Sequence, residues 1–193
     1  MMKKHFQQRI AESILLKEQI MQSDHYLQVL EDCVQVITQC FSGGHTLWLC
    51  GNGGSAADAQ HLAAEFSGRF YKDRKALPAE ALHVNTSYIT AVANDYGYSE
   101  IYARLIDGVA QPGDVLIGLS TSGNSENIVK AFQTAQQKGV ITIGFTGASG
   151  GKMLPYSDYI FQVPSQDTPR IQEMHMLAGH TLCELVESNL FGS

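Results

Sequence analysis

The sequence lacks the stretches that mark nucleic-acid-binding and membrane-spanning proteins. It has no block rich in lysine and arginine, and its formal net charge is −6. A basic surface is what attracts a phosphate backbone, so the composition argues against nucleic acid as a partner. No apolar run approaches the roughly 20 residues needed to cross a bilayer, and the start, MMKKHFQQRI, is polar. We therefore expect a cytoplasmic protein that engages neither nucleic acid nor a membrane.

Cysteine is scarce and shows no CxxC spacing, which argues against a redox motif or a zinc-thiolate site. Most of the cysteines lie in apolar patterns, where a reduced cysteine packs as a small hydrophobe. We expect burial for all four, which are Cys33, Cys40, Cys50 and Cys183.

Signatures of nucleotide binding are also missing or incomplete. The sequence has no Gly-Lys-Ser/Thr motif, so P-loop NTPase chemistry is disfavoured. The segment from Gly51 to Ala56 formally fits the Gly-x-Gly-x-x-Gly/Ala dinucleotide fingerprint. The next expected strand, however, ends His83-Val84-Asn85, without the acidic residue that binds a ribose. We therefore expect no nucleotide cofactor.

What the chain does contain is an alternation of short apolar runs with segments of helical periodicity. Its 193 residues and 44% hydrophobic content suit one domain with a sizeable core, spanning residues 1–193. The expected strands cover residues 46–50, 78–84, 114–119, 140–145 and 159–163. The first expected helix after the opening strand starts at Ser55. The others cover residues 87–95, 100–109, 126–137 and 169–190. This order predicts a doubly wound α/β fold, with a parallel five-stranded sheet covered on both faces.

Two further helices are expected ahead of the sheet. Apolar residues recur at helical spacing over residues 4–22 and 26–41, and Ser23-Asp24 between them offers an N-cap. Residues 1–44 are thus predicted to form an N-terminal helical hairpin. Its apolar stripes fit either ordinary core packing or a subunit interface, since a hairpin outside the α/β unit has spare faces.

The stretch from Cys50 to Arg69 joins a glycine-rich turn to a helix that carries ionisable side chains. Gly51-Asn52-Gly53-Gly54 supplies backbone freedom after the first strand. We expect Ser55 to cap the helix, with unpaired backbone N–H groups directed at an anion. His61 and Glu65 are four residues apart and therefore share one helix face. Such a pair can transfer protons or bind a metal.

A second polar turn follows the third expected strand. It places four hydroxyl groups around a glycine at a helix start, a pattern suited to holding a phosphate through O–H and N–H donors. These hydroxyls belong to Ser120, Thr121, Ser122 and Ser125. Ligands of parallel sheets bind beyond the carboxyl ends of the strands, so both turns are expected at one site. On the final helix, Gln172 and His180 lie broadly on one side, although His175 or His180 alone could be structural.

Four motifs occur in order across nearly the whole chain: GNGGSAADAQH, ANDYG, STSGNS and RIQEMH…GH. With them the sequence resembles the phosphoheptose isomerases of the SIS-domain superfamily, whereas STSGNS alone indicates only phosphosugar binding. The resemblance implies conversion of sedoheptulose 7-phosphate to D-glycero-D-manno-heptose 7-phosphate, the first step of ADP-heptose and lipopolysaccharide core biosynthesis. It also implies a homotetramer with active sites at subunit interfaces, to which the hairpin would contribute.

The resemblance further implies roles for individual residues. Glu65 and His180 would be catalytic, because aldose-ketose isomerisation through an enediol needs a base and an acid/base. One zinc ion per subunit would be bound by His61, Glu65, Gln172 and His180. Whether this zinc polarises the substrate or holds a resting state is open. The substrate would be bound by Asn52, Gly53, Gly54, Ser55, Glu65, Arg69, Asn94, Asp95, Ser120, Thr121, Ser122, Ser125 and Gln172. One departure is Pro169, which stands where some relatives have an aspartate.

Two other functions remain open from the sequence. A related tetrameric SIS-domain factor associates with the bacterial replication initiator, and it is similar even in the RIQEMHML stretch. Its counterparts of Glu65 and His180 are not these acid/base residues, so the presence of both here favours an enzyme. The second alternative is an isomerase of another phosphosugar, because the phosphate-binding turn is shared while other side chains read the length of the sugar.

Overall fold

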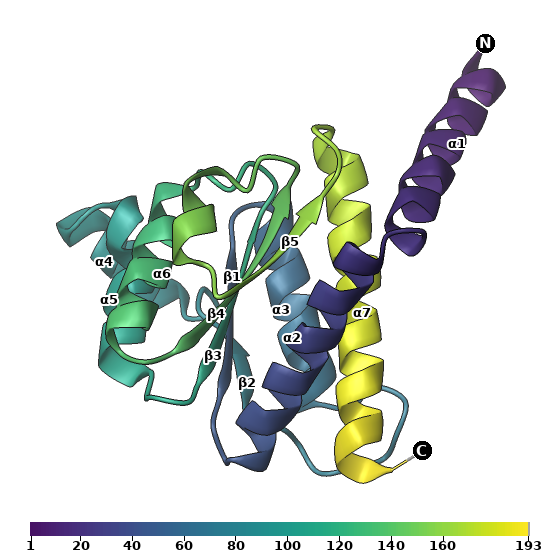
Figure 1. Ribbon diagram of the computed structural model, residues 1–193. Helices are drawn as coiled ribbons and strands as arrows, with labels where there is room; N and C mark the ends of the chain where they lie inside the picture. Colours follow the sequence, from purple (N-terminus) through teal and green to yellow (C-terminus); the bar gives the residue numbers. More distant parts are fainter. Residues whose placement is uncertain (193) are drawn as a thin grey trace.

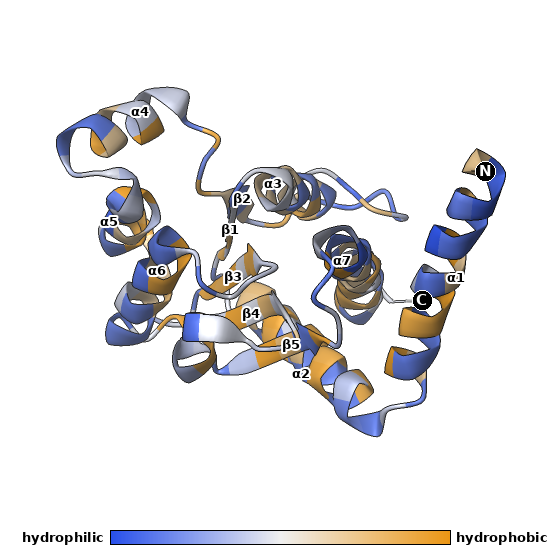
Figure 2. Cartoon of the chain, turned by 90° about the horizontal axis from the view of Figure 1, so that it is seen from above, coloured by the Kyte–Doolittle hydropathy of each residue, from blue (hydrophilic) through white to orange (hydrophobic). Residues whose placement is uncertain are grey.

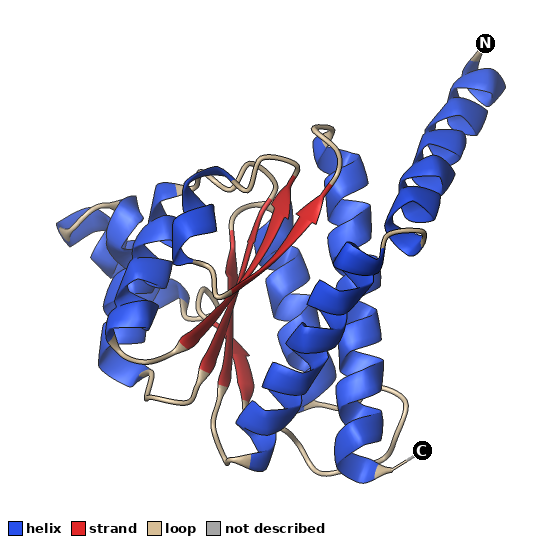
Figure 3. Ribbon diagram, in the orientation of Figure 1, coloured by secondary structure: helices blue, strands red, loops and turns tan. Residues whose placement is uncertain are grey.

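A parallel sheet with the strand order β2-β1-β3-β4-β5 runs through the middle of the molecule (Figure 3). The computed structural model describes residues 1–192, and within them the sheet has five strands. They are β1 (Leu47–Gly51), β2 (Ala79–Ala81), β3 (Val115–Ser120), β4 (Ile141–Gly147) and β5 (Tyr159–Val163). Each neighbouring pair is parallel, and β3 is buried along its whole length. This is why β3 reads as a continuous apolar run instead of an alternating one.

Helices cover both faces of the sheet (Figures 1 and 2). One face carries α4 (Thr86–Asp95), α5 (Ile101–Val109) and α6 (Glu126–Gln137). The other carries α2 (Asp24–Ser42), α3 (Gly54–Ser67) and α7 (Thr168–Phe191). Short 3-10 helices η1 (Tyr98–Glu100) and η2 (Gly151–Tyr156) complete the α4 side. The arrangement confirms the predicted doubly wound α/β fold.

The core accordingly divides into two apolar layers, one on each side of the sheet. The layer under α2, α3 and α7 includes Ile37, Phe66 and Val186. The layer under α5 and α6 is built around Tyr102 and Phe132. All four cysteines are buried and unpaired, as the sequence predicted. Among residues 1–192, no helix combines the length and the apolar character that crossing a membrane requires.

The two predicted N-terminal helices are present as α1 (Met2–Met21) and α2, but the expected hairpin is wrong. Helix α2 packs on the sheet, whereas α1 projects away from the body instead of lying alongside α2 (Figure 1). Only Leu16 and Ile20 of α1 are buried. Large apolar side chains along the rest of α1 are exposed, among them Phe6 at 70% and Ile10 at 59%. Residues 1–44 therefore leave a substantial apolar surface uncovered in the single chain.

Two local expectations are corrected. Strand β2 is confined to Ala79–Ala81 within the expected 78–84, because it is an edge strand that pairs only with β1. Ser55 is not the N-cap of α3; that position belongs to Gly53, whose φ of +56° is one that glycine adopts without strain. Ser55 instead lies buried in the first turn of the helix.

Candidate active site

The two polar turns lie together because of the strand order. The chain moves from β1 outward to β2 and then crosses to β3 on the other side of β1. This reversal between β1 and β3 is the topological switch point at which ligands of doubly wound sheets bind. Gly51 is in register with Leu119, so the turns after β1 and β3 begin side by side. The predicted convergence of the two turns is thus a consequence of the topology.

The turn after β3 has the features of an anion cradle. Ser120 Oγ and Ser125 Oγ lie 3.1 Å apart, and Ser125 is the N-cap residue of α6. Gly123 adopts φ +64°, and a side chain there would collide with the backbone of Gly150. Gly150 and the start of η2 therefore brace the turn, and Asn124 Oδ1 accepts a hydrogen bond of 3.0 Å from Lys152 N. Hydroxyl groups and the N-terminus of α6 meet at this point, an arrangement that suits a phosphate group.

In the turn after β1, the amide of Asn52 is locked by two partners. Ile128 N donates to Asn127 Oδ1 at 3.0 Å, which identifies the oxygen of the buried Asn127 amide. Asn127 and Asn52 then exchange two hydrogen bonds of 2.9 Å, and Tyr98 Oη donates to Asn52 Oδ1 at 3.1 Å. The oxygen of Asn52 thus receives two donors, whereas one N–H of its amide group has no hydrogen-bond partner among residues 1–192. Asn52 therefore offers a hydrogen-bond donor.

Three ionisable side chains converge between α3 and α7. His61 Nε2 lies 3.0 Å from His180 Nε2 and 3.2 Å from Glu65 Oε1. One candidate ligand atom from each residue lies within 4.8 Å of the others. Ligand atoms of a tetrahedral zinc with bonds of about 2.0 to 2.1 Å are about 3.3 Å apart. Two imidazole nitrogens and a carboxylate at these spacings fit such an ion.

Gln172, the fourth predicted metal ligand, lies about two turns nearer the start of α7 than His180 does. Its Nε2 donates to Ser55 Oγ at 3.5 Å, and it packs against Gly54, where a Cβ would come within 2.8 Å of Nε2. The absence of a side chain at Gly54 thus gives Gln172 its place beside the turn. Pro169 occupies the first turn of α7, where its missing N–H costs nothing.

His175 and His180 are distinguished by their surroundings. His175 is fully buried, its Nε2 lies 3.2 Å from Thr146 O, and burial lowers the pKa of its imidazole to about 4. It is therefore a neutral core residue at physiological pH. His180 is partly exposed and faces His61. Of these two histidines, only His180 belongs to the site.

The other predicted substrate-binding residues lie outside these clusters. Asn94 and Asp95 are exposed at the end of α4, and Asn94 Nδ2 donates to Asp95 Oδ1 at 2.8 Å. Arg69 is exposed just beyond α3, and its Nη1 donates to Phe70 O at 3.5 Å. Within residues 1–192, the hydrogen bonds of Asn94 and Arg69 thus go to neighbours in the sequence.

Comparison with known proteins assigns the family. The SIS-domain family model matches residues 10–147, a span that contains both polar turns. The phosphoheptose isomerase of Clostridium acetobutylicum is 50% identical over 99% of this chain and 97% of that protein. The chain belongs to the phosphoheptose isomerase family.

Solved structures agree with this assignment. Phosphoheptose isomerase GmhA from Neisseria gonorrhoeae superposes with a TM-score of 0.91 at 36% identity, covering 97% of this chain and 100% of that one. A phosphoheptose isomerase from Francisella tularensis gives 0.93 at 31% identity, covering 97% and 99%. The likeness spans the sheet, both layers of helices and the N-terminal helices.

In this member of the phosphoheptose isomerase family, several residues that shape the site were missed by sequence reasoning. Asn127 stands two positions after the STSGNS motif, and this proximity was its only signal. Tyr98 follows ANDYG directly, but nothing in the sequence pairs it with Asn52. Phe70 contacts His180 from the loop after α3, and Glu187, near the end of α7, accepts a hydrogen bond from Phe70 N.

Proposed function

We propose that this protein interconverts sedoheptulose 7-phosphate and D-glycero-D-manno-heptose 7-phosphate as an aldose-ketose isomerase. One observation carries the proposal. Glu65 and His180 both lie next to His61, in a chain that is 50% identical to a phosphoheptose isomerase. The hydroxyl-rich turn after β3 supports a phosphorylated ligand, because it offers neutral donors at a helix N-terminus.

The reaction needs one proton to move between two carbons and another to move between two oxygens. We assign the first transfer to the Glu65 carboxylate. It takes a proton from the carbon beside the carbonyl and returns it to the carbon that carried the carbonyl. His180 protonates the carbonyl oxygen as the enediol forms, and the imidazole is reprotonated when the other enediol oxygen becomes the new carbonyl. Both groups end each cycle in their starting protonation states.

The remaining predicted residues bind and orient the sugar phosphate. Ser120, Thr121, Ser122 and Ser125 hold the phosphate. The N–H of the Asn52 amide that has no partner within residues 1–192 donates to a sugar oxygen. The other residues to which we assign contact with the sugar are Gly53, Gly54, Ser55, Arg69, Asn94, Asp95 and Gln172. Because the side-chain hydrogen bonds of Arg69 and Asn94 within residues 1–192 go to sequence neighbours, we infer that both side chains turn to the ligand when it binds.

Zinc fits the donors between α3 and α7. His61, Glu65 and His180 supply two nitrogens and an oxygen at suitable spacing, and Gln172 could add an amide oxygen after a rotation of its side chain. When bound, zinc would supply Lewis-acid polarisation of a substrate oxygen. Glu65 and His180 are common to both assignments.

We also infer a homotetramer with active sites at subunit interfaces, located in the cytoplasm and serving ADP-heptose and lipopolysaccharide core synthesis. The apolar surface left exposed on α1 supports association of subunits. Figure 2 shows apolar residues along α1, which stands apart from the rest of the chain.

A panel of phosphorylated ketoses tests the substrate assignment. Turnover of heptulose, hexulose and pentulose phosphates by the same preparation should give the highest kcat/KM with sedoheptulose 7-phosphate. A higher kcat/KM for a hexulose or pentulose phosphate would assign the protein to another phosphosugar. Absence of turnover with all three, together with tight binding of the replication initiator, would favour the non-catalytic alternative.

A further inference from the structure

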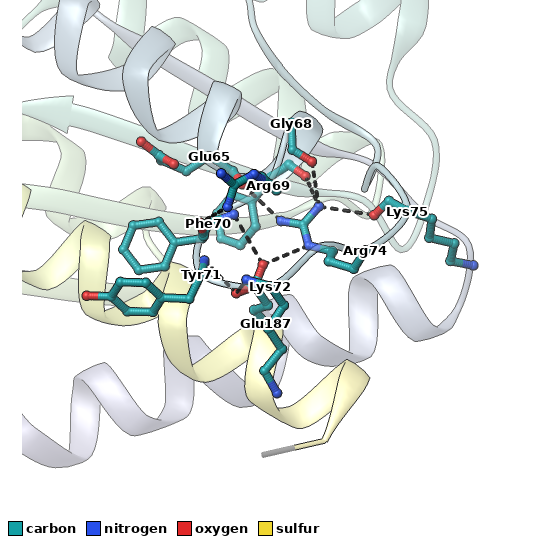
Figure 4. A network of polar contacts seen from close by, with 10 residues as sticks. Glu65, Gly68, Arg69, Phe70, Tyr71, Lys72, Arg74, Lys75 and Glu187 are labelled. Carbon is teal, nitrogen blue, oxygen red and sulfur yellow. Dashed lines mark hydrogen bonds and ion pairs between the residues drawn. The ribbon is translucent and has the colours of Figure 1, made fainter.

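A buried ion pair joins the loop after α3 to the far end of α7. Arg74 Nε lies 2.9 Å from Glu187 Oε1, and the two side chains are only 3% and 2% exposed. Figure 4 shows the pair enclosed by the loop of residues 68–75. Ionised groups are costly to bury, and replacing a buried pair with apolar side chains is often neutral or stabilising. A role in stability alone therefore explains this pair poorly.

The Glu187 carboxylate determines the path of the loop. It accepts hydrogen bonds from three consecutive backbone N–H groups, those of Phe70 (3.2 Å), Tyr71 (2.8 Å) and Lys72 (2.9 Å). With Arg74, each carboxylate oxygen has two donors. Consecutive N–H groups directed at one anion form a concave backbone segment. The loop thus wraps around a single side chain of α7.

The Arg74 guanidinium fixes the last turn of α3. Its Nη2 donates to Glu65 O at 2.9 Å, and its Nη1 donates to Phe66 O at 2.7 Å and to Gly68 O at 3.0 Å. Carbonyl groups at the end of a helix lack partners within the helix, and Arg74 supplies them. Figure 4 shows the Glu65 carboxylate pointing away from the guanidinium. Arg74 therefore holds the backbone of Glu65, while the carboxylate lies 3.2 Å from His61 Nε2.

The same loop also contacts His180. The ring of Phe70 stacks on the His180 imidazole, with centroids 5.9 Å apart and planes at 25°. Phe70 is the first residue whose N–H is held by Glu187. The network of Arg74, Glu187 and the loop therefore contacts both site residues. Arg74 bonds to the backbone of Glu65, and Phe70 stacks on the ring of His180.

We infer that Arg74 and Glu187 are positioning residues. They hold the Glu65 carboxylate and the His180 imidazole in the relative positions that proton transfer requires. The inference rests on the proposed isomerase function. Neither residue touches the reacting atoms; both act through the backbone of α3 and through Phe70. A displacement of about 1 Å at a reacting centre can lower a rate by about 100-fold, so loss of this network should appear in kcat.

Glu187→Gln tests the inference, and Asp114→Asn is its matched control. Asp114 is also a buried carboxylate, and it accepts from Thr46 N, Gln111 N and Trp48 Nε1 at 2.9 Å each. It directly precedes β3 and so lies at the N-terminal end of the strands, whereas the polar turns follow their C-terminal ends. Both variants change a buried carboxylate to an amide. Measurements at temperatures where each is fully folded separate positioning from stability.

For Glu187→Gln we expect kcat for sedoheptulose 7-phosphate to fall about tenfold or more, with KM changed much less, because the phosphate turn is untouched. Arg74→Lys should behave alike, since an ammonium cannot reproduce the guanidinium fork. Asp114→Asn should keep the wild-type kcat. If Glu187→Gln keeps the kcat of Asp114→Asn, the inference is wrong.

Proton NMR of the His180 ring gives a readout that does not depend on turnover. Stacking by Phe70 shifts the ring signals, and Phe70→Leu defines their positions without it. The signals of Glu187→Gln should move toward those of Phe70→Leu, while those of Asp114→Asn should not move. Unmoved signals in Glu187→Gln would refute the inference, whether or not the wild type is active. An inactive wild type would by itself overturn only the proposed function. Should Glu187→Gln fail to fold, Arg74→Lys is measured in its place against the same two outcomes.

Discussion

At the scale of single residues, the orientation of the Asn52 amide follows from one backbone donor. Ile128 N orients Asn127, Asn127 orients Asn52, and Tyr98 occupies the second lone pair of Asn52 Oδ1. The chain of hydrogen bonds makes Asn52 a donor toward the ligand. We therefore expect its partner on the sugar to be an oxygen that accepts a hydrogen bond.

Asn52→Asp removes that donor while keeping the size of the side chain. We expect KM for the sugar phosphate to rise about tenfold, since losing a hydrogen bond and facing an oxygen with a carboxylate costs on the order of 1 to 2 kcal/mol. Steady-state kinetics measure the change. Asn189→Asp, an exposed amide on α7 whose Nδ2 contacts Thr38 Oγ1 at 3.3 Å, is the control. An unchanged KM in Asn52→Asp would show that Asn52 does not donate to the substrate.

His61 separates metal binding from proton transfer, because we assign it only to zinc. We expect His61→Ala to lose zinc from the purified protein, since one of two imidazole ligands is removed. Elemental analysis measures the zinc content of the variant and of His25→Ala, which changes an exposed histidine at the start of α2. Equal zinc content in His61→Ala and the wild type would refute the ligand assignment.

At the scale of elements, the contact between Glu187 and the loop joining α3 to β2 should make the free energy of unfolding depend on pH. Burial alone would raise the pKa of Glu187, but the backbone N–H groups of residues 70–72 and Arg74 outweigh it, and the pKa lies below its ordinary value of 4.5. A carboxyl whose pKa is depressed by folding stabilises the protein above its unfolded pKa. This contribution is lost as the pH falls through the folded pKa.

Glu187→Gln should therefore lower the free energy of unfolding by about 3 to 5 kcal/mol at pH 7, where an uncompensated Arg74 remains buried. The difference from the wild type should shrink as the pH falls below about 4.5. Urea unfolding at equal protein concentration, at pH 7 and at acidic pH, measures it. A difference that is the same at both pH values would contradict the ionised pairing of Glu187.

Elements with regular periodicity were predictable, and links between distant segments were not. The strands and helices follow from apolar patterns, and the two polar turns converge because parallel strands end at one edge. The prediction that Ser55 caps α3 is wrong. Serine is a preferred N-cap residue, but Gly53 occupies this position with a φ of +56°, which glycine adopts without strain. The hydrogen bond that Phe70 N donates to Glu187 joins residues 117 positions apart, and no periodic pattern in the sequence indicates it.

At the scale of the whole molecule, α1 extends apolar side chains away from the α/β body. A single chain leaves them in water, and their burial in a subunit interface would be favourable by about 25 cal/mol per Å². We expect the wild type to have four times the 21.1 kDa mass of the chain by light scattering.

Ile10→Asp should reduce that mass, because it places a charge in the apolar stripe of α1. Val109→Asp, at the exposed end of α5 on the other side of the sheet, should leave the mass unchanged. A monomeric wild type, or an Ile10→Asp variant with the wild-type mass, would contradict the role of α1 in assembly.

The central claim is that Glu65 and His180 carry the two proton transfers of the isomerisation. Turnover of sedoheptulose 7-phosphate by Glu65→Gln and His180→Gln tests it most directly, with the wild type and Asp114→Asn measured alongside. Because a positioned acid or base contributes about 100-fold or more, we expect each of the two site variants to lose at least that factor in kcat. Full turnover by Glu65→Gln and His180→Gln would contradict the claim.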